Sequence, residues 1–140
     1  MLKDEITRLY RKFRLLHYRS LFGKIRERDG SLSATEAYAV DVIFLLGNPT
    51  LGEFAECLGL SQPNATYKVN NLMAKGYVLK TTSEQDRREC RLCVTDKFYS
   101  YYQIKDTGLE HALDALKACY SDEQLAAFEE MLRTFVEAME

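Results

Sequence analysis

Residues 50–95 carry the feature that most restricts the fold of this chain: two short helices joined by a tight turn and followed by a pair of strands. Thr50 and Ser61 each have a side-chain oxygen that can cap a helix N-terminus. Gly59 suits the C-terminal turn of the first helix. Pro63 falls in the first turn of the second helix, where its missing N–H costs little. The pattern predicts a helix-turn-helix.

Two strand-like segments, 78–81 and 91–95, follow the second helix after Gly76. The polar stretch SEQDRREC lies between them and is typical of a hairpin tip. A hairpin directly after the second helix of a helix-turn-helix is a wing. The central part of the chain is therefore predicted to be a winged helix-turn-helix.

Amphipathic helices are predicted on both sides of the central pair of helices, because apolar side chains recur at spacings of three and four. Ser33 and Glu36 form a potential capping box before one of them. The flanking helices are predicted over residues 1–28, 34–46, 96–120 and 122–139. The predicted fold class is mainly α.

A length of 140 residues is that of one domain with its own core. We expect residues 1–140 to form a single domain in which 33–96 are the winged helix-turn-helix lobe. Residues 1–30 and 97–140 are expected to supply dimerisation helices, because the apolar stripe of the last helix is too large to remain in water.

The second helix of the pair, about residues 62–75, has two chemically different faces. On a helical wheel, Ala65, Val69 and Leu72 cluster in a narrow sector, as core residues do. Amides and a tyrosine lie opposite, and residues 61–80 hold three lysines and no acid. A solvated helix face normally mixes both charges. The absence of acids therefore favours a polyanionic partner.

The polar face of this helix is predicted to bind DNA. An asparagine amide can donate and accept at the N6/N7 edge of adenine, and a tyrosine can contact a thymine methyl group or a phosphate. A polar surface helix without a partner is the alternative, which the basic hairpin that follows disfavours. The residues assigned to DNA binding are Ser61, Pro63, Asn64, Tyr67, Lys68, Asn70 and Asn71.

The hairpin tip is predicted to bind the adjacent minor groove. It contains Arg87 and Arg88, and the negative potential of a narrow minor groove attracts arginine. Asp86 can orient Arg88 through a charge-assisted pair. A solvated turn formed with the help of Asp86 is the alternative. The two roles of Asp86 are compatible.

The segments LSQPNATYKVNNLMAKGYVLK and SEQDRRECRLCVTDKF resemble the MarR family of transcriptional regulators. The Asp86-x-Arg88 pair and the strand that ends in Val94-Thr95 are similar to the wing of that family. Two positions depart from the family pattern. Asp96-Lys97-Phe98 occurs where similar proteins reach a glycine, and Lys80 occurs where arginine is common.

The resemblance implies a homodimer whose first and last helices interlock. It also implies a site for a small anionic or aromatic effector, near the junction of these helices with the lobes, which lowers DNA affinity when occupied. The residues that would line such a site here are Arg14, His17, Tyr18 and Tyr38. A solvated basic face that pairs with the acidic last helices is the alternative.

Other classes of protein have weaker support. Apolar residues make up 46% and charged residues 29% of the chain, as in an ordinary globular protein. Cys90 and Cys93 are three residues apart on a strand, so their side chains point to opposite faces. The two histidines give only weak support for a metal site. We expect no enzyme, no cofactor and no metal. The four cysteines have no framework spacing, and no signal peptide or membrane span is recognisable, so a cytoplasmic protein is expected.

The motifs and the resemblance together predict a ligand-responsive repressor that binds double-stranded DNA as a homodimer at a palindromic operator. The net charge of −2 neither supports nor excludes DNA binding, since only the contacting face must be basic. A winged-helix protein–protein interaction module without DNA binding is the alternative. Such a module should show acids or an apolar patch on the face where this chain has amides and lysine.

Overall fold

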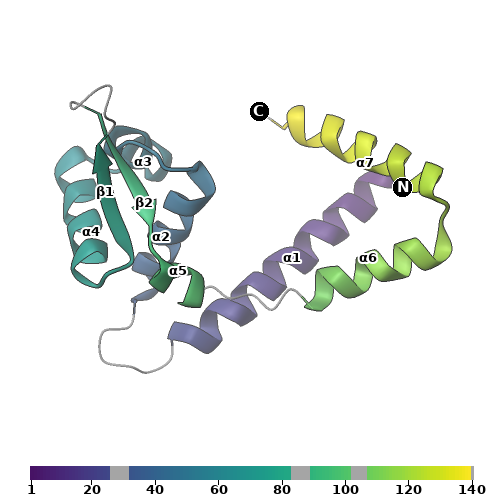
Figure 1. Ribbon diagram of the computed structural model, residues 1–140, viewed down its shortest axis with the longest axis horizontal. Helices are drawn as coiled ribbons and strands as arrows, with labels where there is room; N and C mark the ends of the chain where they lie inside the picture. Colours follow the sequence, from purple (N-terminus) through teal and green to yellow (C-terminus); the bar gives the residue numbers. More distant parts are fainter. Residues whose placement is uncertain (26–31, 83–88, 102–106, 140) are drawn as a thin grey trace. The chain divides into compact units, whose positions relative to one another are not determined.

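The computed structural model describes residues 1–25, 32–82, 89–101 and 107–139 (Figure 1). The chain divides into two compact units, Met1–Gln103 and Ile104–Glu140. The elements of the described residues are α1 Leu2–Ile25, α2 Ala34–Leu46, α3 Leu51–Leu58, α4 Gln62–Ala74, β1 Val78–Thr82, β2 Cys90–Val94, α5 Asp96–Tyr101, α6 Thr107–Cys119 and α7 Asp122–Glu137. The predicted class, mainly α with a small antiparallel wing, is confirmed.

Side-chain caps fix where the helices of the winged lobe begin and end. Ser33 and Glu36 form the predicted capping box at α2. Thr50 and Ser61 cap α3 and α4 through their hydroxyl groups. Gly59 follows α3 with a φ of 63°, the left-handed conformation that lets the chain turn sharply into α4. These local signals place the two helices of the pair as the sequence predicts.

The core of the lobe lies between α2, α3, α4 and the base of the wing. Every one of these elements contributes completely buried apolar side chains, and the residue before β1 and the first turn of α5 add two aromatic rings. The core includes Val40, Ile43, Phe54, Ala65, Val69, Leu72, Tyr77, Val78, Leu92 and Phe98. The three predicted inward residues of α4 are all in this set, so the opposite face of α4 points outward.

The wing is anchored at its base to the helix-turn-helix. β1 and β2 pair antiparallel with Val78 opposite Val94. The N–H of Leu92 donates to the carbonyl of Pro49 at 2.8 Å. The turn between α2 and α3 therefore joins the edge of the sheet, and the base of the wing is held against the lobe.

One predicted helix, 96–120, is two helices in the structure. α5 ends at Tyr101 and α6 begins at Thr107, with residues 102–106 outside the described part of the chain. Gly108 lies at the start of α6, and glycine has the lowest helix propensity after proline. A continuous helix is weakest at such a point, and apolar spacing alone does not reveal the weakness. The last three residues of the predicted first helix also lie outside the described residues.

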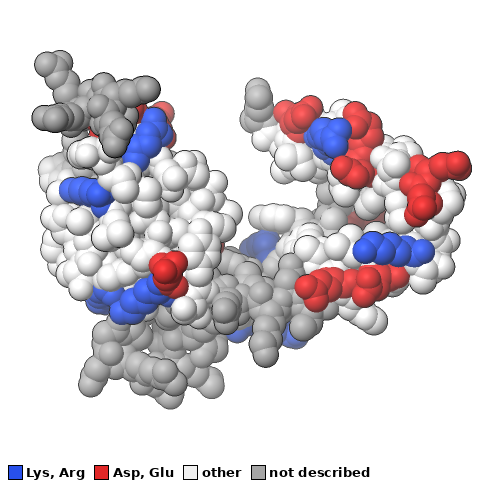
Figure 2. Space-filling model, in the orientation of Figure 1, with Lys and Arg blue, Asp and Glu red and all other residues white. Residues whose placement is uncertain are grey.

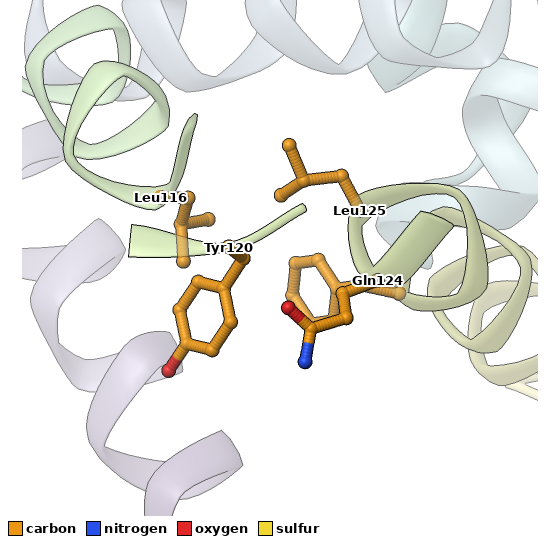
Figure 3. A pocket seen from close by; sticks show the side chains of 5 residues that line it. Leu116, Tyr120, Gln124 and Leu125 are labelled. Carbon is orange, nitrogen blue, oxygen red and sulfur yellow. The ribbon is translucent and has the colours of Figure 1, made fainter. Parts of the chain in front are cut away.

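α6 and α7 form the second unit and keep much of their apolar surface in contact with solvent. The exposed apolar side chains include Leu109, Leu113, Phe128, Met131, Leu132, Phe135 and Val136. A hollow of about 330 Å³ lies at the turn between the two helices (Figure 3), lined by Leu116, Tyr120, Gln124, Leu125 and Phe128. α1 in the first unit also exposes apolar side chains, among them Leu9, Phe13 and Leu16. Among the described helices, none combines the length and the apolar character that a membrane span requires.

Candidate nucleic-acid interface

α4 is held by one buried face, and the side chain of Ser61 caps its start. Ala65, Val69 and Leu72 are completely buried. In the turn before the helix, the N–H of Leu60 donates to the carbonyl of Ala55 at 2.9 Å. Burying a side chain as large as that of Val69 or Leu72 stabilises a fold by about 1.5–3 kcal/mol. The helix therefore has one fixed outward face.

The outward face carries the residues that the sequence assigns to DNA. The exposed ones are Ser61, Pro63, Asn64, Tyr67 and Asn70, whereas Lys68 and Asn71 are half-buried. Tyr67 has 69% of its surface in solvent. Ser61 accepts the N–H of Asn64 at 3.4 Å, so its hydroxyl proton can still be donated to a phosphate. The face offers amide, phenol and hydroxyl groups that can bind base edges and phosphates.

Lys75 is paired with an acid of another helix, whereas the charge pattern of the sequence indicates a cation in a segment without acids. The sequence counts it with Lys68 and Lys80 as a cation of an acid-free segment, but Lys75 Nζ lies 2.9 Å from Glu36 Oε1 on α2. The side chains of Lys75 and Glu36 are only 32% and 16% exposed. A local charge count misses this pair because the partners are 39 residues apart. Lys80 is exposed on β1.

The predicted wing contacts Asp86, Arg87 and Arg88 lie outside the described residues. At the base of the wing, Arg91 makes two contacts. Its guanidinium donates to the Glu89 carboxylate at 2.7 Å and to the Asn48 carbonyl at 3.2 Å. Arg91 thereby ties β2 to the turn between α2 and α3. No local pattern signals this contact, since Asn48 is 43 residues away.

The charged side chains are distributed unevenly over the two units. In Figure 2 the winged lobe carries separate basic side chains and a few acidic ones on a largely uncharged surface. The helices of the second unit carry acidic side chains in the same view, in line with the acids of α7 at Asp122, Glu123, Glu129 and Glu130. Acidic side chains are therefore a feature of α6 and α7 in this view.

Three of the four predicted effector residues lie on α1 and contact other α1 residues. The guanidinium of Arg14 lies 5.4 Å from the centre of the Tyr10 ring. The ring centres of His17 and Tyr18 are 5.8 Å apart. Tyr38 lies on α2 and is 41% exposed. Among the contacts found within the described residues, none joins Tyr38 to the other three.

Asp41 on α2 adds a negative charge near His17. Burial raises the pKa of Asp41 above the ordinary range of an aspartate, and the nearby charge of His17 lowers it by less. A half-buried carboxylate at this place disfavours a second anion beside His17. Asp41 has no signal in the sequence because it is an isolated acid in an apolar helix.

The cysteines of the wing are separate thiols. Cys90 is exposed, and Cys93 Sγ lies 3.4 Å from Thr81 Oγ1. Within the part of the chain that the structure describes, no three side chains of His, Cys, Asp or Glu are grouped so as to hold a metal ion.

Comparison with known proteins identifies the central segment. Residues 31–89 match the model of the MarR family. This range contains α2, the helix-turn-helix of α3 and α4, and β1. No curated protein matches the chain significantly in sequence.

Solved structures share the fold over nearly the whole chain. FabT of Streptococcus pneumoniae, solved in complex with DNA, is 22% identical, with 99% of this chain and 97% of that chain covered and a TM-score of 0.55. A MarR-like regulator of Thermotoga maritima is 24% identical, with 95% of each chain covered and a TM-score of 0.53. MepR of S. aureus in a DNA complex is 13% identical, with 96% of this chain and 99% of that chain covered and a TM-score of 0.54. At these identities the likeness shows the fold.

Proposed function

We propose that this chain, whose residues 31–89 match the model of the MarR family, is a sequence-specific DNA-binding transcriptional regulator of that family. The observation that carries the proposal is the outward face of α4, where amides and Tyr67 are presented in a segment, 61–80, without an acid. The second helix of a helix-turn-helix is the one that enters the major groove. FabT and MepR, which share the fold, were both solved with DNA.

Within this proposal, the residues of α4 divide between bases and phosphates. Asn64, Tyr67 and Asn71 contact base edges, because they lie on the side of α4 away from the buried stripe. Ser61 and Lys68 hold phosphates, since they lie at its end and flank. Pro63 and Asn70, both exposed, complete the contact surface.

The wing supplies the second contact of each lobe. Arg87 and Arg88 approach the minor groove next to the major-groove site, and Asp86 orients Arg88. The tie from Arg91 to the α2–α3 turn supports this assignment, because it makes the base of the wing move with the helix-turn-helix.

The regulator acts as a homodimer and represses by occupying a palindromic operator. The exposed apolar stripe of α7 and the hollow beside it support a partner that covers them. A second copy fits this role, because a two-fold dimer presents two reading helices to two half-sites of opposite orientation.

An effector site between α1 and α2 completes the proposal. Arg14, His17, Tyr18 and Tyr38 supply aromatic surface and hydrogen-bond donors for it. The Asp41 carboxylate near His17 restricts the effector to uncharged or weakly charged aromatic compounds. Binding there lowers the affinity for the operator.

The test is selection of bound DNA from a random duplex pool by the full-length protein, followed by titration of the recovered sites. We expect recovery of one imperfect palindrome. Addition of aromatic compounds at saturating concentration should identify those that release the operator. Recovery of sequences without a shared motif, at an affinity equal to that for random DNA, would refute sequence-specific binding.

A further inference from the structure

The C-terminal end of α4 is held by side chains from two distant parts of the chain. Glu36 on α2 pairs with Lys75 at the end of α4 at 2.9 Å. From the other side, Lys97 Nζ donates to the Lys75 carbonyl at 2.7 Å, and Thr95 Oγ1 donates to the Gly76 carbonyl at 2.6 Å. The outward face of α4 is thus attached at its end to both α2 and the start of α5.

Hydrogen bonds hold the Glu36 carboxylate in its contact with Lys75. Its Oε1 accepts both the backbone N–H of Ser33, at 3.1 Å, and the ammonium group of Lys75. Burial raises the pKa of Glu36, but the hydrogen bonds from Lys75 and Ser33 outweigh it and hold the pKa below the usual range. Within the described residues, Glu36 Oε2 is buried and has no hydrogen-bond partner. The carboxylate is therefore ionised at neutral pH and forms its ion pair with Lys75.

The apolar contacts of α4 do not by themselves set its angle against α2. The buried stripe of Ala65, Val69 and Leu72 is apolar, and apolar contact is non-directional. A partly buried ion pair contributes little net stability, since desolvation offsets its attraction, but it acts at a defined distance and angle. Base contacts need placement within about 0.5 Å. A directional contact at the end of the helix can supply this placement, whereas it adds little to the stability of the fold.

We propose that Glu36, acting through Lys75, is a positioning residue for DNA recognition: the pair fixes the angle of α4 against α2, so that the reading face enters the groove in one orientation. The inference rests on the proposed function. It adds a residue on the buried side of the lobe, Glu36, to the determinants of sequence preference.

The alternative is that Lys75 leaves Glu36 and binds a phosphate itself. The two roles predict opposite signs for Glu36→Gln. If Lys75 binds phosphate, removal of its competitor strengthens DNA binding. If the pair positions α4, the same change weakens specific binding. Glutamine preserves the capping box with Ser33, so the substitution removes the ion pair and leaves the start of α2 intact.

Glu53→Gln is the matched control. Glu53 is exposed and occupies the same third helical position of α3, after the N-cap Thr50, that Glu36 occupies after Ser33. Both substitutions remove one negative charge from the lobe at equivalent sites. Only Glu36 is paired with α4.

The experiment measures the affinities of the full-length protein and its variants for a selected operator and for random duplex DNA. We expect Glu36→Gln to weaken operator binding about tenfold, in the range for loss of one good base contact, with binding to random DNA unchanged. Glu53→Gln should leave the ratio of the two affinities unchanged. The double variant Glu36→Gln/Lys75→Met removes both charges of the pair, so it should melt near the wild-type temperature while keeping the reduced ratio.

The salt dependence of Lys75→Met gives an independent readout. A slope reduced by about one would mark a direct phosphate contact and overturn the positioning role. Operator binding by Glu36→Gln as tight as that of Glu53→Gln would overturn it as well. A wild-type protein that fails to distinguish the operator from random DNA would overturn the proposed function and this role together, whereas normal discrimination by both Glu36 variants would overturn this role alone.

Discussion

Neighbouring residues of α4 are assigned different tasks because successive side chains leave a helix about 100° apart. Tyr67 projects into solvent, Lys68 is half-buried at the flank, and Val69 points into the core. Asn71 is half-buried, so it reaches less far than Tyr67 but has less freedom to lose on binding. Substitution at single positions can therefore separate base reading from phosphate contact.

Asn71→Ala and Lys68→Ala are expected to affect binding in different ways. Loss of the Asn71 amide should cost about 1–3 kcal/mol and relax the preference at one base pair. Loss of the Lys68 ammonium should weaken all sequences alike and lower the salt slope by about one. The measurement is affinity for the operator and for a set of single-base variants of it. Identical profiles for the two proteins would refute the assignment.

Asp41→Asn is expected to stabilise the protein at neutral pH. Burial raises the pKa of Asp41 in the folded state, so the folded protein holds the proton more tightly than the unfolded chain. The contribution of Asp41 to the free energy of unfolding therefore becomes less favourable as the pH rises through the raised pKa. The variant should melt higher than the wild type at pH 7.5, and the difference should shrink as the pH falls toward the ordinary aspartate range near 4.

Asp114→Asn on α6 is the control for this titration, because Asp114 is an exposed carboxylate in a helix. It should change the melting temperature little at either pH. A stabilisation by Asp41→Asn of the same size at pH 7.5 and pH 4 would show that the charge of Asp41 is not its cause.

At the scale of elements, the parts that were predictable from the sequence are those with local causes. The capping box of Ser33 and Glu36, the left-handed Gly59 and the inward stripe of α4 all depend on residues within four positions, and the structure has each of them. The pairs Glu36–Lys75 and Arg91–Asn48 join residues 39 and 43 apart. Such contacts follow from the packing of α2 against α4 and β2. The spacing of residues in the sequence does not predict this packing.

The separation of α5 from α6 was missed for a related reason. Apolar periodicity continues through the region and predicts one helix, whereas the helix boundaries depend on the weak propensity near Gly108 and on packing. Phe98, which departs from the family pattern, is buried against the Phe44 ring at a centroid distance of 5.1 Å. The start of α5 is thereby fixed to α2 by an aromatic contact that the sequence does not specify.

The wing can be tested as one element by a double-mutant cycle on its predicted tip. Arg88→Ala should weaken operator binding, most strongly where the flanking DNA is A/T-rich and its minor groove is narrow. Asp86→Ala should also weaken binding, although it removes a negative charge, because Arg88 loses its orienting partner. The double variant should be little worse than Arg88→Ala alone. Tighter binding by Asp86→Ala would assign the tip to a solvated turn.

At the scale of the whole molecule, the surface of the terminal helices indicates a partner. α7 has no buried residue within the described chain, and its apolar side chains recur along one stripe. A monomer would leave that stripe and the hollow at the α6–α7 turn in water. Burying an apolar side chain of this size contributes about 1.5–3 kcal/mol. A few such side chains buried at an interface would therefore favour association.

Leu132→Lys should convert a dimer into a monomer and thereby change how the protein binds DNA. Leu132 lies in the apolar stripe of α7, and a buried unpaired ammonium is costly. The wild type should sediment as a dimer at micromolar concentration and bind a palindrome with half-sites about 10 bp apart. The variant should sediment as a monomer and lose the preference for two half-sites over one. Its salt dependence should fall, because each lobe then supplies only its own phosphate contacts.

Glu130→Lys, on the polar side of the same helix, places the same ammonium group at an exposed position and also removes the carboxylate that pairs with Arg133. It should remain a dimer with normal preference for the palindrome, which separates the loss of the apolar contact from the gain of a cation. If Leu132→Lys stays dimeric, the stripe is not the interface. If the wild type is a monomer and still prefers two half-sites, the two copies assemble only on DNA, and the terminal helices do not form a stable dimer in solution.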